Sequence, residues 1–327
     1  MRELIRQFSS PLSPYIIDLI KEKRACGFKY EIEVIEFRLL DRFLIEQNHT
    51  KISLPRHLVE LWCRRRHGES SLNQASRIST VRLIAEYLIR RKVHAYYPPK
   101  HSTPIAKSDF SPHIFSHDEI SALFKAADEL PVIKPTYWYI ALFPVVIRLL
   151  YSSGLRISEI CQLLWRDVDL KEGVIRIRAG KFRKDRLLPL SSSMLEYMKK
   201  HAILQTDRSP ETPVFPTPNG KTCTRTRFYL CYRAALKQAG IFHGGRGRGP
   251  RMHDLRHTFA VHNLERCLRL KDDVNLNLPI LADYLGHEEL SATQKYLRLI
   301  PLIHQEIVTR MENSIGKQIK EYKDETN

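Results

Sequence analysis

The spacing of apolar residues along the first hundred positions predicts helices and very little strand. A segment from Ser13 begins with a good N-cap residue, and Pro14 suits the first turn of a helix. The next segment repeats apolar residues at helical spacing, at Val34, Phe37, Leu40 and Leu44. Residues 54–66 and 80–92 follow the same plan. We therefore predict a helical domain over residues 1–97.

A proline-rich stretch follows this domain and marks a boundary. Residues 98–113 hold four prolines among polar residues, which excludes a regular helix or a central strand there. Beyond it, Ser116 with Glu119 three residues later forms the sequence signature of a capping box at a helix start. We predict a linker over residues 98–113 and a second domain over residues 114–327.

The second domain is predicted to be mostly helical, with one pair of strands. Residues 174–178 and 186–190 alternate as strands do, and the glycine and charged residues between them suit a hairpin turn. The longest apolar run starts at Tyr137, contains Pro144 and stops at Arg148, so it predicts a buried helix rather than a membrane span. The expected fold class is mainly α with a small β-sheet: a helical domain followed by a mixed α/β domain.

The composition of the chain indicates which kind of partner it binds and in which cellular compartment it works. The chain of 327 residues has a formal net charge of +17, which favours a polyanion, and nucleic acid before an anionic membrane. Its six cysteines are scattered without a C-x-x-C pair, as in a reduced cytosolic protein. The N-terminus lacks an apolar signal segment, so we expect a cytoplasmic, nucleoid-associated protein without a membrane partner.

Basic clusters indicate where DNA would be contacted. The predicted helices at residues 54–66 and 80–92 each end in a basic cluster. The helix dipole favours basic residues at a C-terminus, so any one cluster can serve either to stabilise the helix end or to contact a phosphate. Several clusters in one small domain favour DNA. The predicted DNA-binding residues are Arg64, Arg65, Arg66, Arg77, Arg82, Arg90, Arg91, Lys92, Arg183 and Lys184.

Residues that can take part in catalysis lie in four short segments of the second domain. The first is "GLRISEI", which places Arg156 at a helix entry, and the second is the hairpin turn with Lys181 and Lys184. The third is "HDLRH", in which His253 and Arg256 share a helical face. In the fourth, "GHEELSATQKY", a glycine can end one helix, Ser291 and Gln294 match a capping box, and a tyrosine follows within the next turn.

Arginines, a lysine, histidines and a tyrosine, without a pair of carboxylates, suit attack on a phosphodiester. Guanidinium groups stabilise the charge that grows on the phosphate oxygens, which Mg²⁺ does in other enzymes, so no metal or cofactor is expected. A tyrosine can act as a nucleophile that forms a covalent phosphoenzyme. At a usual pKa near 10 the phenol needs help to ionise. His253 can supply the base and Lys181 the acid for the departing 5′ oxygen.

These four segments, in this order and approximate spacing, resemble the tyrosine recombinase (phage integrase) family. The resemblance covers residues from about 113 onward, and the first domain more weakly resembles the family's core-binding domain. It implies a recombinase catalytic domain, with Lys184 competing with Lys181 for the acid role. The catalytic residues that it implies are Arg156, Lys181, His253, Arg256, His287 and Tyr296.

The resemblance also implies a reaction and an assembly. Such enzymes cut and rejoin double-stranded DNA at specific sites through a 3′-phosphotyrosine and a Holliday junction, without ATP or metal. Four protomers act on two sites, and accessory proteins are open as further partners. Residues 302–315 carry apolar side chains near helical spacing, and we predict a C-terminal exchange helix that docks on a neighbouring protomer, with packing on its own domain as the alternative. We expect an integrase or transposase of a mobile element.

Three other functions fit parts of the pattern. A type IB topoisomerase uses the same residue types but relaxes one duplex. A DNA-binding protein that has lost catalysis would keep the fold alone. A metallohydrolase would use His253 and His257, which are four residues apart as in a zinc pair, but Asp254 replaces the usual glutamate and a third ligand is missing from the pattern.

Overall fold

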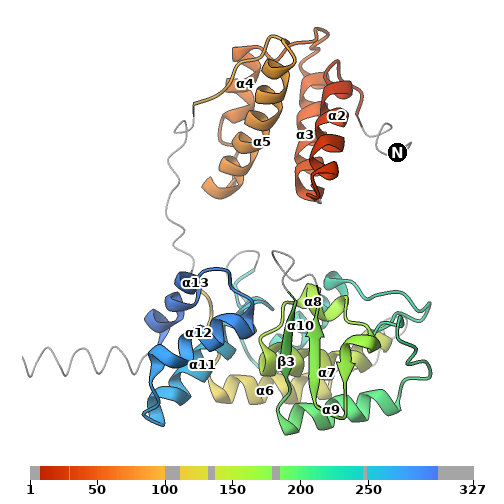
Figure 1. The fold of residues 1–327 in the computed structure, drawn as a ribbon, viewed down its shortest axis with the longest axis vertical. Helices are drawn as coiled ribbons and strands as arrows, with labels where there is room; N and C mark the ends of the chain where they lie inside the picture. The colour runs from red at the N-terminus through yellow and green to blue at the C-terminus, as the bar shows by residue number, and fades with distance from the viewer. Residues whose placement is uncertain are drawn as a thin grey trace, which may run out of the picture. The chain divides into compact units, whose positions relative to one another are not determined.

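The computed structural model describes residues 8–28, 30–99, 111–131, 137–178, 185–245 and 249–300. The chain forms two compact units that divide between Phe110 and Ser111, inside the predicted linker over residues 98–113 (Figure 1). Each unit has a hydrophobic core of its own. Within the described residues, no helix combines the length and apolar content that a bilayer crossing needs.

The first unit is helical, as predicted. Its helices are α2 (Ser13–Ala25), α3 (Glu31–Glu46), α4 (Arg56–Cys63) and α5 (Ser71–Arg90). Helix α5 contacts each of the other three and is the centre of the unit. The apolar positions that predicted α3 face inward, since Phe37 and Leu44 are fully buried. Pro14 lies in the first turn of α2, where its missing N–H costs no hydrogen bond.

The second unit is also mainly helical. Its α-helices are α6 (His117–Asp128), α7 (Tyr137–Ser153), α8 (Ile157–Cys161), α9 (Ser192–Ile203), α10 (Arg225–Gln238), α11 (Asp254–Arg269), α12 (Val274–Leu285) and α13 (Leu290–Gln294). Two 3-10 helices, η1 (Trp165–Asp167) and η3 (Lys295–Leu299), complete the helical set of the described residues. The predicted capping box opens α6, with Ser116 and Glu119 exchanging both hydrogen bonds. The mainly α fold class with a small sheet is confirmed.

A small antiparallel sheet of three strands lies beside these helices. Its strands are β1 (Val168–Asp169), β2 (Val174–Ile177) and β3 (Arg186–Pro189), in the order β1-β2-β3. Ile175 and Leu188 face each other across β2 and β3, and both are fully buried in the core. The predicted strand pair is confirmed, and β1 is an additional edge strand that the sequence analysis did not predict.

Helix α7 is longer than its apolar run. The apolar run stops at Arg148, but α7 continues to Ser153. Arg148 lies in the helix with only 8% of its surface exposed, because its guanidinium forms a paired hydrogen bond with the Asp128 carboxylate. The charge is thus neutralised where the helix packs, and the helix does not end.

A separate apolar cluster joins α11, α12 and η3, which lie together at one side of the second unit (Figure 1). Val261 and Leu264 of α11 pack with Leu285 at the end of α12. Tyr296 and Ile300 at the C-terminal end of the described chain belong to the same cluster. The cluster therefore fixes the tyrosine of the fourth segment against the helix that carries the third.

Candidate functional site

The site begins at the turn between α7 and α8. Gly154 has a φ of +58°, and an added Cβ would lie 2.6 Å from a ring carbon of Phe259 and 2.9 Å from Leu285. Only glycine fits there, because both the conformation and the space exclude a side chain. Arg156 then caps α8, and its guanidinium donates to the Glu159 carboxylate at 2.8 Å. The turn thus delivers Arg156 next to α11 and the end of α12.

Glu159 holds two arginines. Its carboxylate accepts a hydrogen bond from Arg186, the first residue of β3, at 2.8 Å, in addition to that from Arg156. Arg186 also donates to the backbone carbonyl of Tyr284 on α12 at 3.1 Å. Burial raises the pKa of Glu159, but the hydrogen bonds and charges of the two arginines outweigh it and lower the pKa overall. Glu159 is therefore a carboxylate that connects α8, β3 and α12.

Arg256 occupies the first turn of α11 and is 2% exposed. It donates one hydrogen bond to the Gly154 carbonyl at 2.6 Å and another to the Leu285 carbonyl at 2.5 Å. Burial, and then the nearby Arg156, lower its pKa to about 10, so it stays charged at neutral pH. Among the described residues no carboxylate forms a salt bridge with it. Such a buried, oriented cation attracts an anion.

The tyrosine of the fourth segment lies at this cation. Tyr296 is 5% exposed, and its hydroxyl lies 3.1 Å from Nδ1 of His257 on α11. Burial raises the pKa of the phenol, whereas the charge and hydrogen bond of Arg256 and the charge of Arg156 lower it. One chain therefore brings the two arginines and the phenol together.

Two further histidines belong to the surroundings of Tyr296. Gly286 ends α12 with a φ of 69°, as predicted, and His287 follows it. The His287 ring stacks on the Tyr296 ring, and its Nδ1 lies 2.7 Å from the hydroxyl of the buried Thr293. His253 is the N-cap residue of α11, and its ring meets the His257 ring edge to face, with 4.8 Å between centroids.

The local structure around the tyrosine differs from the prediction. Ser291 and Gln294 do not form a capping box: the N-cap residue of α13 is Glu289, and the Ser291 hydroxyl donates to the Glu289 carboxylate. The α-helix ends at Gln294, and Tyr296 belongs to the 3-10 helix η3. The tighter 3-10 turn is held by packing on α11 rather than by a cap.

Residues 113–301 match the model of the phage integrase family. A putative integrase/recombinase of Sinorhizobium fredii is 30% identical over 90% of this chain and 95% of its own length. The chain belongs to the phage integrase family. A tyrosine recombinase XerD of Oceanobacillus iheyensis is 28% identical, over 75% of this chain and 77% of its own. The recombinase is also similar in fold to solved lambda integrase bound to DNA, with a TM-score of 0.60, 16% identity and coverage of 85% and 91%.

A second solved structure shares the fold of the recombinase. It is XerH site-specific recombinase bound to a palindromic difH substrate, with a TM-score of 0.61, 19% identity and coverage of 88% of this chain and 78% of that chain. The family assignment confirms the resemblance seen in the four segments. It also identifies this chain as a tyrosine recombinase rather than a metallohydrolase.

The recombinase brings together five of the residues that the resemblance implied. Arg156, His253, Arg256, His287 and Tyr296 lie around one point of the second unit. The sixth, Lys181, lies outside the described residues. Arg183 and Lys184 lie outside them as well.

Sequence reasoning missed three groups in this site. His257, rather than the expected base His253, contacts the phenol. Glu159 and Arg186 form the ion pairs that orient Arg156. The "GLRISEI" segment did contain Glu159 three residues after the arginine, which was the available signal; Arg186 carried none, because its partners are distant in sequence.

One predicted DNA contact of the first unit is contradicted by its burial. Arg77 is 2% exposed, and its guanidinium pairs with the Glu69 carboxylate at 2.6 Å. It also donates to the backbone carbonyls of Trp62 and Arg64. These bonds tie α5 to the segment after α4, so the guanidinium is a buried structural link and does not face DNA.

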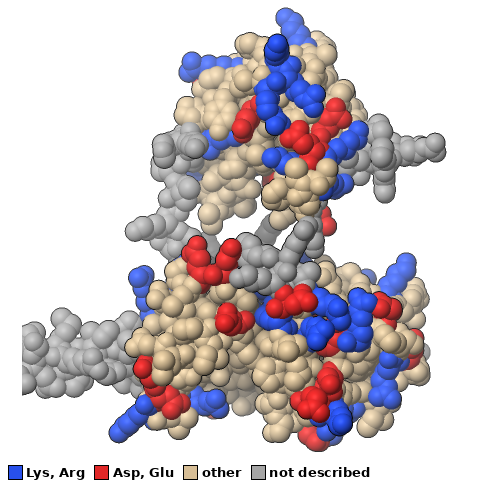
Figure 2. Space-filling view, viewed as in Figure 1, with Lys and Arg blue, Asp and Glu red and all other residues tan. Residues whose placement is uncertain are grey.

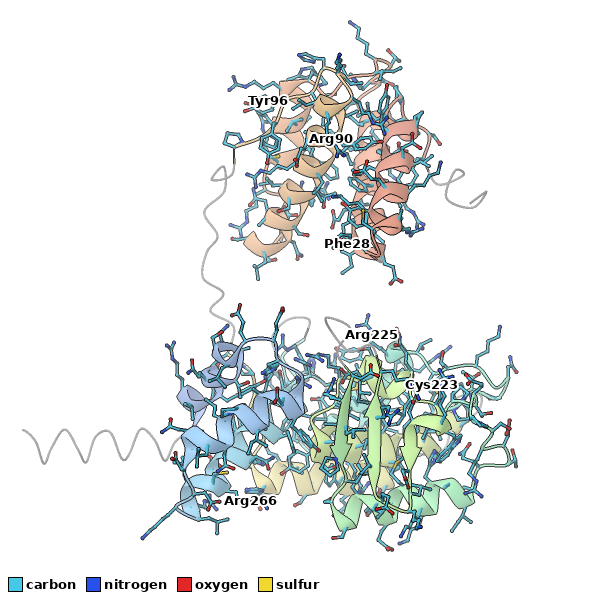
Figure 3. The ribbon with its side chains drawn as sticks, in the orientation of Figure 1. Phe28, Arg90, Tyr96, Cys223, Arg225 and Arg266 are labelled. Atoms are coloured by element: carbon cyan, nitrogen blue, oxygen red, sulfur yellow. The ribbon has the colours of Figure 1, made fainter. Side chains whose placement is uncertain are left out.

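The other basic residues of the first unit remain near its surface, and Figure 2 shows Lys and Arg side chains spread over the face in view. Arg64, Arg65 and Arg66 are exposed beyond the end of α4, and Arg66 stacks on Trp62. Arg82 is half-buried and donates to the carbonyls of Pro98 and Pro99. Arg90, labelled in Figure 3, pairs with Glu22 at 2.9 Å; Arg91 and Lys92 are exposed next to it.

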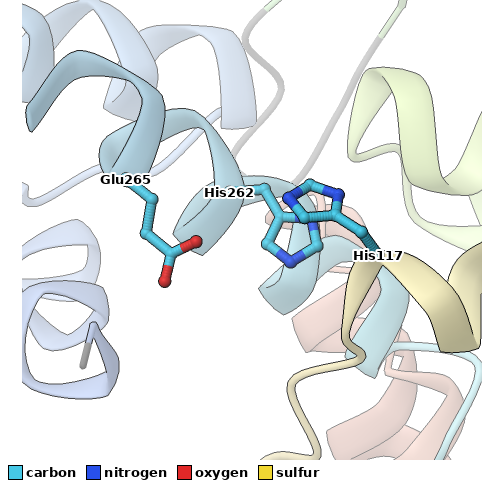
Figure 4. Close-up of side chains that lie close together, drawn as sticks. All are labelled: His117, His262 and Glu265. Atoms are coloured by element: carbon cyan, nitrogen blue, oxygen red, sulfur yellow. The ribbon is translucent and has the colours of Figure 1, made fainter. Parts of the chain in front are cut away.

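Three potential metal ligands lie together away from this site, two on α11 and one at the start of α6. His117, His262 and Glu265 have ligand atoms within 4.8 Å of one another (Figure 4). The imidazoles of His117 and His262 are stacked, and Nδ1 of His262 already lies 2.9 Å from the Tyr151 hydroxyl. His253 and His257, the pair of the metallohydrolase alternative, are not part of this group, and no third ligand joins them among the described residues.

Proposed function

We propose that this chain is the site-specific DNA recombinase of a mobile element. It binds double-stranded DNA at specific sites and exchanges strands through a 3′-phosphotyrosine and a Holliday junction. The phosphotyrosine keeps the energy of the phosphodiester, so rejoining to another 5′ hydroxyl requires neither ATP nor a metal. The proposal rests on the family assignment together with the chemistry of the cluster around Tyr296.

In this proposal, each side chain of the cluster has a role at one phosphate. Arg156 and Arg256 bind the non-bridging oxygens and stabilise their charge as it grows in the transition state. His287 donates a hydrogen bond to the same phosphate, His253 is the base that takes the proton of the phenol, and Lys181 protonates the departing 5′ oxygen. Lys184 is the alternative acid. Tyr296 attacks phosphorus and forms the covalent intermediate.

One observation carries the proposal. Arg256 is a buried cation with its donors aimed by two backbone carbonyls, and the Tyr296 hydroxyl lies beside it. A structural arginine in the core would pair with a carboxylate, as Arg77 does with Glu69. The unpaired charge next to a nucleophilic oxygen supports an anionic substrate that is attacked at this point.

The proposed DNA contacts of the first unit follow from exposure. Phosphate contacts are assigned to the exposed basic residues Arg64, Arg65, Arg66, Arg90, Arg91 and Lys92, with Arg82 at the edge, and to Arg183 and Lys184 in the hairpin. Each phosphate contact that is lost should lower the salt dependence of binding by about one unit of slope. Four protomers on two sites form the active assembly, and residues 302–315 link them.

The mobile-element role is supported by a relative that is named as an integrase and aligns over most of this chain. The putative integrase/recombinase of Sinorhizobium fredii aligns over 95% of its own length. A Tn1549 transposon integrase shares the fold with a TM-score of 0.60 at 15% identity, which supports the architecture alone. A chromosomal role of the Xer type is the second candidate, because Xer recombinases are also among the relatives.

The test is covalent trapping on DNA. A binding site is first selected from a random duplex pool with the full chain, and the selected site is then nicked so that cleavage cannot reverse. We expect a protein–DNA band that resists denaturant with the wild type and disappears with Tyr296→Phe. Tyr284→Phe is the matched control: it removes a phenol oxygen that, among the described residues, donates to the Pro189 carbonyl and does not contact Tyr296, and the band should persist.

Other outcomes identify the alternatives. DNA binding without any covalent band would indicate a DNA-binding protein that has lost catalysis. A covalent band together with relaxation of plasmids that lack the site would indicate a type IB topoisomerase. Loss of the band with a chelator would contradict the metal-free reaction.

A further inference from the structure

His257 lies beside the reacting oxygen. Its Nδ1 is 3.1 Å from the Tyr296 hydroxyl, and the two ring centroids are 5.5 Å apart. The residue follows Arg256 in the first turn of α11, so the helix that aims the cation also aims this imidazole. His253 meets the edge of the His257 ring from the N-cap position. Among the described contacts, no hydrogen bond joins His253 to Tyr296.

The donors and acceptors of the neighbouring side chains determine that Tyr296 is the donor in its contact with His257. The Arg256 guanidinium, which lowers the pKa of Tyr296, has donors only, so towards it the phenol oxygen can act only as an acceptor. The one phenol proton is then free to point at Nδ1 of His257. This requires the neutral imidazole with its proton on Nε2, which leaves the Nδ1 lone pair towards Tyr296.

The surroundings keep this imidazole neutral. Burial lowers the pKa of His257 to about 4; Asp254 opposes this shift, while Arg251 and Arg256 add to it. The lone pair is therefore available at neutral pH. A phosphodiester bound by the two arginines brings a negative charge beside the ring and raises the affinity of the ring for a proton.

We propose that His257 is the catalytic base that takes the proton of Tyr296 during strand cleavage. This inference rests on the proposed recombinase function and replaces His253 in that single role. As the Tyr296 oxygen bonds to phosphorus, its proton moves to Nδ1 of His257. The bond between phosphorus and the 5′ oxygen breaks, and Lys181 protonates that oxygen. On rejoining, the 5′ hydroxyl attacks phosphorus and gives its proton to Lys181, the bond between phosphorus and the Tyr296 oxygen breaks, and His257 returns its proton to the phenol.

If His257 is the base, its loss slows cleavage even when the 5′ oxygen is replaced by a better leaving group. Two suicide duplexes are made from the selected site, one native and one with sulfur in place of the scissile 5′ oxygen. Sulfur leaves without an acid, so Lys181→Ala should be slow on the native duplex and recover on the sulfur duplex. His257→Asn should be slowed by about 100-fold or more on both, because nucleophile activation still fails.

A second histidine on the same helix supplies the matched control. Nδ1 of His262 lies 2.9 Å from the Tyr151 hydroxyl, so His262→Asn disrupts the same kind of contact away from Tyr296. It should cleave both duplexes within about threefold of wild type. DNA affinity and thermal unfolding of each variant establish that binding and folding are kept.

A change in the phenol gives an independent measurement if His257→Asn folds poorly. A fluorinated tyrosine at position 296 is more acidic and needs a base less. In that background, the loss of cleavage rate caused by His257→Gln or His257→Ala should be at least about tenfold smaller than with the natural tyrosine.

Different experimental results would overturn the recombinase function and the role of His257. Wild type that forms no covalent complex on either duplex overturns the recombinase function itself. Active wild type with a His257→Asn variant that is unaffected, or that recovers on sulfur as Lys181→Ala does, overturns only the role of His257. An equal loss with natural and fluorinated tyrosine overturns it as well, because it shows that the phenol proton is not involved.

Discussion

Arginine side chains serve three different purposes in this molecule, and their partners separate them. Arg77 is buried and fully paired, Arg256 is buried with no carboxylate partner among the described residues, and Arg90 is an exposed partner of Glu22. The first stabilises a fold, the second creates a positive site, and the third is available to a polyanion. Charge alone does not distinguish them.

The energetic difference between two of these arginines is testable. We expect Arg77→Met to lower the free energy of unfolding of the first unit by about 3 to 5 kcal/mol, because Glu69 and two carbonyls lose their donors inside the protein. Urea unfolding of full chains that also carry Trp138→Phe and Trp165→Phe, followed by the fluorescence of the remaining Trp62, measures the change.

Arg90→Met is the control for this prediction. Its ion pair with Glu22 is exposed and should contribute less than about 1 kcal/mol. Its effect should instead be seen in DNA affinity. Equal stability losses for the two variants would show that the Arg77 pair is not a structural link.

The residues of the site were predictable to the extent that they carry their own chemistry. Arg156, Arg256, His287 and Tyr296 could be predicted because the segments that carry them resemble the family's motifs in order and spacing. His257 was visible in "HDLRH", but only the fold shows which of two histidines meets the phenol. Arg77 was misassigned because a basic cluster in sequence does not reveal that Glu69 is within reach.

At the scale of elements, periodic segments were predictable and short ones were not. Helix α3 buries a stripe of apolar residues, and the pattern that predicts it is also what stabilises it. Helix α5 begins at Ser71, before the predicted segment 80–92, and its first part buries the polar Gln74 and Arg77. The two-residue strand β1 and the 3-10 helix η3 have no pattern of their own. They form because β2 and α11 are already in place, which a local sequence cannot show.

Helix α9 carries a histidine that should make the second unit sensitive to acid. His201 is stacked on Trp165 and Phe215, and its Nε2 lies 2.7 Å from the Val214 carbonyl. Burial lowers its pKa, although the hydrogen bond opposes the shift. The unfolded state therefore binds the proton more readily, and the stabilisation is complete above the unfolded pKa, near 6.5, and is lost as pH falls below it.

We expect wild type and His201→Gln to differ in how steeply the free energy of unfolding changes with pH. Between pH 7.5 and pH 5 the free energy of unfolding should fall by about 1 kcal/mol more in wild type than in His201→Gln, which binds no proton. Urea unfolding at several pH values measures it. His57→Gln, an exposed histidine on α4, should keep the wild-type slope. A His201→Gln variant with that same slope would contradict the assignment.

For the whole molecule, the proposed assembly depends on residues beyond the described chain. Ile300, the last described residue, is fully buried in the cluster that holds Tyr296. A chain that ends after Pro301 therefore keeps the contacts that place the nucleophile. The predicted helix over residues 302–315 is removed, so its part in the reaction can be separated from cleavage.

We expect this truncation to cleave a single suicide site within about fivefold of wild type but to lose strand exchange between two sites by at least about 100-fold, because exchange needs contacts between protomers. Trapped covalent complex and recombinant product are measured in parallel. A chain that ends after Lys317 keeps the predicted helix and should do both. If the shorter chain fails already at cleavage, the helix packs on its own domain and supports the site from within; if it still exchanges strands, the segment does not link protomers at all.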